Sequence, residues 1–189
     1  MSTNVWNVRV PSLMYARLRA IVTAGCIAAA TLGLASSAAA QEAGLPVGTK
    51  APVLVLEGLD GSRLDLASVI GKKPVVLEFW ATWCPLCRKL EPSLAAARAA
   101  FGGEGLFIGV GVPQNQTPER QAAYVAQQRM TGSYVFDRDG AAYKAFKATH
   151  TSYVVVIDAL GVVVYTGVGA EQDIVAAVRQ ALPGARAGR

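Results

Sequence analysis

The residues best suited to chemistry are two cysteines, Cys84 and Cys87, separated by Pro85 and Leu86. The sequence holds three cysteines in all, and the third, Cys26, lies in an apolar N-terminal segment. A Cys-x-x-Cys disulfide closes too short a loop to restrain the unfolded chain strongly, so the pair points to redox chemistry rather than to stabilisation. The alternatives are a zinc half-site, which would need a second ligand pair that the chain lacks, and two inert buried cysteines.

The position of the pair suggests a role for each sulfur. An apolar run of strand length, residues 74–80, precedes the cysteines, and strong helix formers follow from residue 88 to 101. Free N–H groups and the positive dipole end at the first turn of a helix stabilise a thiolate, so we expect a lowered pKa for Cys84 and a nucleophilic role. Cys87, one turn further along, is the expected resolving thiol, which releases the reduced partner.

Two other titratable residues are candidates for this site. Glu78 lies six residues before Cys84 in an otherwise apolar strand, so we expect its carboxyl group under the disulfide, with a raised pKa, where it would carry the proton of Cys87. The alternative is a glutamate at a strand end or edge that reaches water. His150 is the only histidine, and it is either structural or placed against the cysteines by the loop before the strand at 153–157.

The order of elements predicts an α/β domain with a central mixed sheet, helices on both faces and an N-terminal β-hairpin. The expected strands are 53–57, 63–66, 74–80, 106–112, 133–136, 153–157 and 162–166. The expected helices are 88–101, with Pro92 as a kink, 117–129, 140–147 and 171–182.

The N-terminus differs from the rest of the chain. Arg9, Arg17 and Arg19 precede an uncharged, alanine-rich run that ends at Ala40, so residues 1–40 are expected to be a signal peptide or an N-terminal membrane anchor. Lipidation at Cys26 is a weaker alternative. Residues 41–50 are the expected linker, 51–183 the folded domain and 184–189 a C-terminal tail. A signal peptide or an anchor would each place the domain in the periplasm or another extracytoplasmic space.

The composition excludes two broad classes of protein. Hydrophobic residues make up 52% and charged residues 16%, which suits a folded globule and not a disordered chain. The net charge of +5 falls to +2 without the three leader arginines, since 15 basic and 13 acidic residues remain. We therefore expect no nucleic-acid partner.

The segment from Gly71 to Cys87 closely resembles the membrane-facing thioredoxins of the TlpA/ResA/DsbE group, and the likeness extends over about residues 51–182. The resemblance implies a thioredoxin-like fold and a thiol–disulfide oxidoreductase, which would act on protein thiols or disulfides and be recharged by a membrane electron donor. It also implies a substrate-docking surface around the cysteines, formed by Trp80, Trp83, Pro85, Thr151 and Ser152.

The chain departs from this family at three positions. Ser152 occupies the place where the family has a cis-proline facing the disulfide. Because a cis bond before a non-proline residue costs about 2.5–4 kcal/mol, we predict a trans bond between Thr151 and Ser152. Many relatives carry a glutamate three residues after the second cysteine, where this chain has Leu90, and many TlpA-like proteins carry an asparagine where it has Glu78. Proton transfer is therefore expected at Glu78.

A second, shorter resemblance gives an alternative function. His150 and Thr151 look like the segment that holds the copper-binding histidine of Sco-type copper-delivery proteins, although those proteins space their cysteines by three residues. Two thiolates from Cys84 and Cys87 and the His150 imidazole would suit Cu(I), as in a copper-binding or copper-site assembly module. The oxidoreductase interpretation requires no metal or other cofactor. A thiol peroxidase is a third alternative, but no Pro-x-x-x-Thr-x-x-Cys pattern ends at Cys84.

Overall fold

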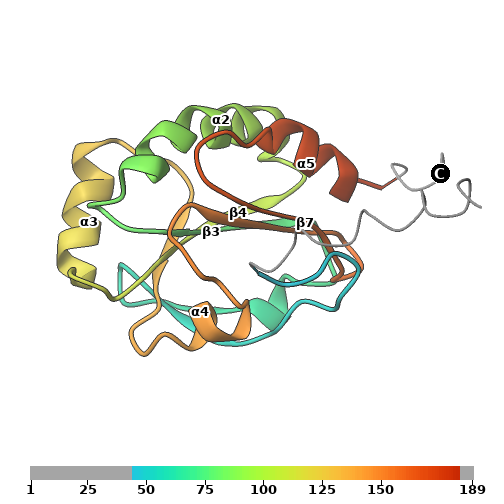
Figure 1. Ribbon diagram of the computed structural model, residues 1–189. Coiled ribbons are helices and arrows are strands. Elements are labelled where there is room, and N and C mark those ends of the chain that lie inside the picture. Colours follow the sequence, from blue (N-terminus) through green and yellow to red (C-terminus); the bar gives the residue numbers. More distant parts are fainter. Residues whose placement is uncertain (1–43, 184–189) are drawn as a thin grey trace, which may run out of the picture. The chain divides into compact units, whose positions relative to one another are not determined.

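The computed structural model describes residues 44–183, which form one seven-stranded sheet with helices packed against it (Figure 1). The strands are β1 (Val55–Gly58), β2 (Arg63–Asp65), β3 (Val75–Trp80), β4 (Leu106–Gly111), β5 (Ser133–Phe136), β6 (Tyr153–Ile157) and β7 (Val163–Val168). The helices are the 3-10 helix η1 (Leu66–Ser68) and the α-helices α2 (Pro85–Phe101), α3 (Pro118–Gln127), α4 (Ala141–Ala145) and α5 (Ile174–Ala181).

The sheet is mixed, with the strand order β2-β1-β5-β4-β3-β6-β7. β3, β4 and β5 are parallel, whereas β6 pairs antiparallel with β3, and β1 pairs antiparallel with β5. β3 therefore lies inside the sheet, and all six of its residues are buried. This position explains its apolar sequence, because a strand covered on both faces has no solvent-facing side.

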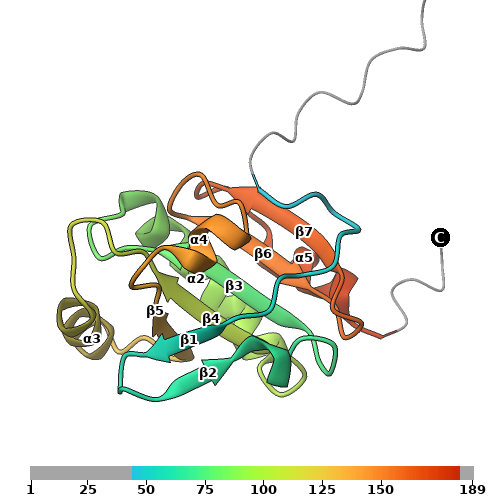
Figure 2. The same cartoon turned by 90° about the horizontal axis from the view of Figure 1, so that it is seen from below.

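Helices cover both faces of the sheet, as the sequence predicts. α2 and α5 lie on one face and α4 lies on the other (Figures 1 and 2). Successive residues of a strand point to opposite faces, so Val76 packs with Leu90 and Val178 on the side of α2 and α5, while Phe79 packs with Phe146 on the other side. The predicted α/β fold class is confirmed.

The segment before Ala51 differs from the linker expected there. The Leu45 side chain is buried, and its amide donates a hydrogen bond to the Tyr153 hydroxyl at 2.9 Å. Lys50 forms an isolated antiparallel bridge with Val162. Since these groups pair with the sheet, ordered packing begins before Ala51.

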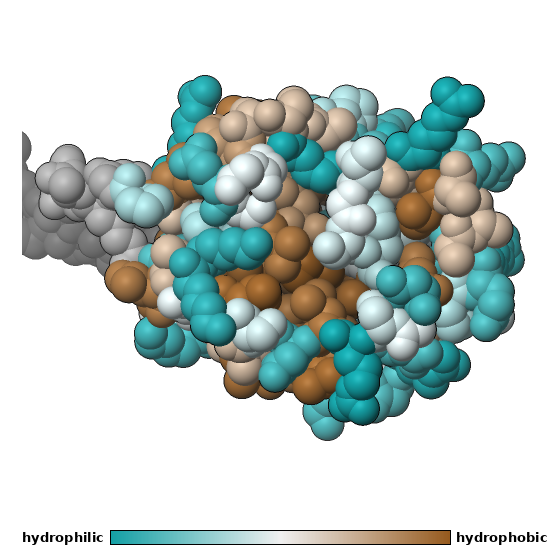
Figure 3. All heavy atoms as spheres, turned by 180° about the vertical axis from the view of Figure 1, so that it is seen from behind, coloured by the Kyte–Doolittle hydropathy of each residue, from teal (hydrophilic) through white to brown (hydrophobic). Residues whose placement is uncertain are grey.

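The predicted leader, residues 1–40, and the predicted tail, residues 184–189, lie outside the described residues, and both stay predictions. Among residues 44–183, no helix is long and apolar enough to cross a membrane. On the side of the domain opposite to the view of Figure 1, apolar side chains gather in the centre and polar ones surround them (Figure 3). The surface of the domain is therefore not uniformly polar.

Candidate active site

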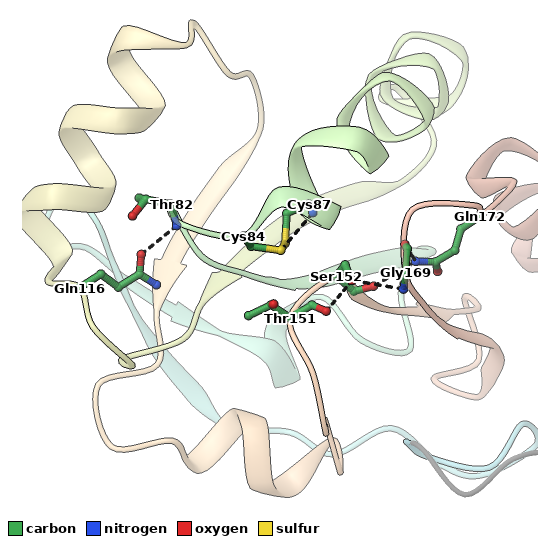
Figure 4. Close-up of a disulfide and its surroundings, with 8 residues drawn as sticks. All are labelled: Thr82, Cys84, Cys87, Gln116, Thr151, Ser152, Gly169 and Gln172. Atoms are coloured by element: carbon green, nitrogen blue, oxygen red, sulfur yellow. Dashed lines mark hydrogen bonds between the residues drawn. A yellow bond between two sulfur atoms is a disulfide. The ribbon is translucent and has the colours of Figure 1, made fainter.

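Cys84 and Cys87 form a disulfide at the junction between β3 and α2, with their Cα atoms 5.4 Å apart (Figure 4). Cys84 is the N-cap of α2, and Pro85 occupies the first turn, where its missing N–H leaves no hydrogen bond unmade. The Cys84 sulfur accepts the Cys87 amide at 3.0 Å. The same N–H group is thus in place to stabilise a Cys84 thiolate once the disulfide is reduced.

Gln116 holds the turn that leads into the disulfide. Its side-chain oxygen accepts the Thr82 amide at 3.0 Å (Figure 4). Its side-chain nitrogen donates to the Val112 carbonyl oxygen. Gln116 is buried, so both bonds are protected from competition with water. Nothing in the sequence pattern points to Gln116, because a glutamine in a loop carries no signal of burial.

Ser152, the residue immediately before β6, faces the disulfide (Figure 4). No cis peptide bond occurs among residues 44–183, so the predicted trans bond before Ser152 is confirmed. The residue has a φ of 61°, in the left-handed region that non-glycine residues rarely adopt, and it is fully buried. A trans bond with a left-handed residue therefore stands where the resemblance implied a cis-proline.

Hydrogen bonds to β3 and to the loop after β7 hold Ser152 in this conformation. Its amide donates to the Phe79 carbonyl oxygen at 2.8 Å, and its hydroxyl accepts the Gly169 amide at 3.1 Å. The Ser152 carbonyl oxygen accepts the Gln172 side-chain nitrogen at 3.0 Å, and the Ser152 hydroxyl donates to the Thr151 carbonyl oxygen (Figure 4). These bonds offset the cost of the left-handed backbone, which is of order 1–3 kcal/mol.

Glu78 is buried in the middle of β3, with 6% of its surface exposed. The alternative of a strand-end glutamate that reaches water is therefore wrong. One carboxyl oxygen is buried without a hydrogen-bond partner. Burial raises the pKa of Glu78 to about 8, with a further rise from Glu91 and an opposing effect of Arg98. Glu78 is thus largely protonated at neutral pH and can exchange a proton near the pKa of a thiol.

Glu78 and Cys87 line the same cavity, which has a volume of about 300 Å³. Side chains of α2 and of α3 and the loop after it form the rest of its wall, namely Arg88, Glu91, Ala95, Arg98, Tyr124, Gln128, Arg129, Met130 and Thr131 together with Trp80 and Ala81 of the β3 end. Glu91 and Arg98 form an ion pair within it. The sequence pattern does not distinguish either residue, since charged side chains on a helix are ordinarily solvated.

The residues predicted to dock a partner differ in accessibility. Trp83 is 42% exposed, and its indole nitrogen donates to the Gln114 carbonyl oxygen at 2.8 Å. Pro85 is exposed and Thr151 is partly buried, so both remain available to a partner. Ser152 is buried, so its side chain is not accessible to a docked partner.

Trp80 is a correction to the predicted docking surface. Only 2% of Trp80 is exposed, and its ring packs against Tyr124 and Tyr134. As the last residue of an internal strand it is covered by neighbouring elements, so it lines the cavity and does not contact a docked protein.

His150 is exposed, and its Nδ1 atom lies 2.9 Å from the Thr149 hydroxyl. In the described part of the chain, no three His, Cys, Asp or Glu side chains gather closely enough to hold a metal ion. The geometry therefore does not bring His150 together with Cys84 and Cys87 as a ligand set. Copper binding by these three residues stays a prediction that no contact supports.

A family model described as Redoxin matches residues 46–182. The thioredoxin-like protein YneN of Bacillus subtilis (strain 168) is 30% identical over 101 residues, which cover 53% of this chain and 59% of YneN. The thiol-disulfide oxidoreductase ResA of the same organism is 41% identical over 61 residues, which cover 32% of this chain and 34% of ResA. The chain thus spans about a third to three fifths of the length of these curated relatives.

A similar solved structure supports the same relationship. The crystal structure of a putative thiol:disulfide interchange protein DsbE from Chlorobium tepidum has a TM-score of 0.63 and 26% sequence identity to this chain. The match covers 72% of this chain and 94% of that one. The likeness therefore includes nearly the whole of the compared domain.

Proposed function

Because this chain belongs to the Redoxin family and has the thioredoxin-like fold of its TlpA/ResA/DsbE-like members, we propose that it is a thiol–disulfide oxidoreductase that reduces disulfides of extracytoplasmic proteins. The observation that carries the proposal is the Cys84–Cys87 disulfide at the N-terminus of α2, beside the buried carboxyl group of Glu78. This arrangement supplies an activated thiolate, a resolving thiol and a proton carrier.

The catalytic cycle moves two electrons from the dithiol to the substrate. The Cys84 thiolate attacks one sulfur of a substrate disulfide, and the other substrate sulfur leaves as a thiolate that takes up a proton. The fraction of Glu78 that is ionised accepts the proton of Cys87, and the resulting Cys87 thiolate attacks the Cys84 sulfur. The S–S bond between Cys84 and the substrate breaks, the second substrate thiol is released and protonated, and the Cys84–Cys87 disulfide forms.

A protein partner would dock on the exposed Trp83 and Pro85 side chains and on the backbone near Thr151. Only 1% of Cys84 is exposed in the disulfide form, so a partner has to displace neighbouring side chains to reach its sulfur. The exposed aromatic and apolar side chains beside Cys84 suit such a close contact, since apolar area is what a docked protein would bury.

Export and recharging complete the proposal. The arginines and alanine-rich run of residues 1–40 support export through a signal peptide or an anchor. After each cycle the Cys84–Cys87 disulfide has to be reduced again, and a membrane protein that passes electrons outward would be the donor.

The test is the reduction of insulin disulfides by the purified protein in the presence of dithiothreitol, followed by the precipitation of the free B chain. We expect the protein to accelerate the reaction above dithiothreitol alone. A variant with both cysteines replaced by serine is the matched control and is expected to lose the acceleration. Equal activity of this variant would show that the proposed function is wrong.

A further inference from the structure

The buried carboxyl group of Glu78 needs a route by which protons reach solvent. It lies on the central strand of the sheet and shares the cavity of about 300 Å³ with Cys87. A cavity of this size has room for several water molecules, and its lining is polar enough to hold them. Protons that Glu78 exchanges with Cys87 can therefore travel through this space.

One stripe of α2 forms a wall of the cavity. Cys87, Glu91, Ala95 and Arg98 follow each other at spacings of four, four and three residues, so they lie on the same face of the helix. Glu91 comes one turn after Cys87. The helix thus places a second carboxyl group on the cavity wall next to the resolving cysteine.

Glu91 is more accessible than Glu78. The Glu91 side chain is 29% exposed and that of its partner Arg98 is 14% exposed, whereas Glu78 is 6% exposed. The two acids are thus an inner and an outer group of one cavity. Among the described residues, Glu78 and Glu91 are the only ones with a carboxyl group that line this cavity.

Burial and the charge of Arg98 have opposing effects on the pKa values of Glu78 and Glu91. Burial raises the pKa of Glu91, and the neighbouring Arg98 limits the rise. The other titratable groups that face Glu78 or the cavity are Arg88, Tyr124, Arg129 and Tyr134. Burial raises the pKa of Tyr134 to about 12, so this tyrosine stays protonated and does not compete as a proton acceptor.

We propose that Glu91, held by Arg98, is the outer proton carrier that connects Glu78 to solvent through the cavity. The inference rests on the proposed oxidoreductase function. When a thiolate attacks Cys84 in the disulfide, the S–S bond breaks and Cys87 leaves as a thiolate. Glu78 gives its proton to Cys87, and Glu91 passes a proton from solvent to the Glu78 carboxylate. In this scheme Glu91 acts through Glu78 and exchanges no proton with the sulfur atoms directly.

The experiment measures reduction of the Cys84–Cys87 disulfide by dithiothreitol between pH 5.5 and 9.5, followed by tryptophan fluorescence and expressed per dithiothreitol thiolate. The variants are Glu91→Gln and Arg98→Gln, and Glu104→Gln is the control because Glu104 is exposed and outside the cavity. The wild-type rate constant is expected to fall as Glu78 loses its proton, with an inflection near its pKa of about 8.

The two cavity variants are expected to shift this inflection in opposite directions. Loss of the Glu91 charge lowers the inflection and slows the reaction about tenfold near neutral pH, and imidazole, which fits the cavity and carries protons, restores the rate. Loss of the Arg98 charge raises the inflection. Glu104→Gln behaves as the wild type, with no gain from imidazole.

Two results would contradict the inference, and each leaves the proposed function intact. One is a Glu91→Gln profile that matches Glu104→Gln. The other is a slower Glu91→Gln variant that imidazole does not accelerate, which would show a structural role for the ion pair. A wild-type protein without dithiol-dependent insulin reduction would instead overturn the proposed function itself.

Discussion

The Ser152 amide donates a hydrogen bond to the Phe79 carbonyl oxygen at 2.8 Å, which ties the loop facing the disulfide to the strand that leads into it. Ser152 makes this bond from a left-handed backbone conformation, with a φ of 61°. Proline has no N–H group and a φ of about −65°, so it cannot reproduce this arrangement. The loop that faces the disulfide is thus held by a different local conformation from the cis-proline that the sequence resemblance implies.

Replacement of Ser152 by proline is therefore expected to destabilise the protein. Ser152→Pro loses the buried bond to Phe79 and requires a different backbone, which together should lower the free energy of unfolding by about 3 kcal/mol or more. Ser152→Ala removes only the hydroxyl bonds and should cost about 1 kcal/mol. Urea unfolding of the oxidised proteins measures both. A Ser152→Pro variant as stable as the wild type would show that this loop accepts the cis-proline form.

The buried Glu78 makes stability depend on pH. Its pKa rises from 4.5 in the unfolded chain to about 8 in the folded one. Between these values the unfolded state loses a proton that the folded state keeps, so the contribution of Glu78 to stability is complete below pH 4.5 and is lost as the pH rises to 8.

Glu78→Gln removes this titration, so the variant should gain stability relative to the wild type as the pH increases from 5 to 8. Each unit of pKa shift corresponds to about 1.4 kcal/mol, and the relative gain should reach several kcal/mol. Thermal unfolding at a series of pH values, with the exposed Glu104→Gln as control, measures the difference. Parallel curves for the wild type and Glu78→Gln would contradict the shifted pKa.

Trp83 is expected to matter for protein substrates and not for small ones. Trp83→Ala removes an exposed aromatic side chain next to Cys84, so the rate of insulin reduction should fall severalfold, while reduction of a small aromatic disulfide should change less than twofold. Leu160→Ala is the matched control, because Leu160 is 64% exposed in the turn between β6 and β7. An equal loss with both substrates would indicate that Trp83 shapes the disulfide itself.

The sequence predicts the elements well where hydrophobic patterning is strong. Strands 133–136 and 153–157 have the observed bounds, and the cysteines lie at the predicted strand-to-helix junction, since apolar runs and helix-start residues act locally. The start of the domain is different. Residues 41–50 contain two glycines and a proline and are predicted to be a linker, but Leu45 packs against the distant Tyr153, a contact that no local pattern reveals.

The site is predictable only in part for the same reason. Glu78 stands out as a charge in an apolar strand, but Glu91 and Arg98 resemble any charged pair on a helix surface until α3 and the loop after it close the cavity over them. Trp80 belongs to the same aromatic-rich motif as Trp83, and only the burial of β3 on both faces separates their roles. Tertiary packing decides these cases.

The most direct test of the account is the trapping of a mixed disulfide with a peptide that contains one intramolecular disulfide. Mass spectrometry of the reduced Cys87→Ser variant should detect a covalent adduct through Cys84, because the resolving thiol is missing. The Cys84→Ser variant should accumulate little adduct, and the wild type should release reduced peptide. Adduct formation through Cys87 in place of Cys84 would contradict the assignment of the two sulfurs on which the mechanism rests.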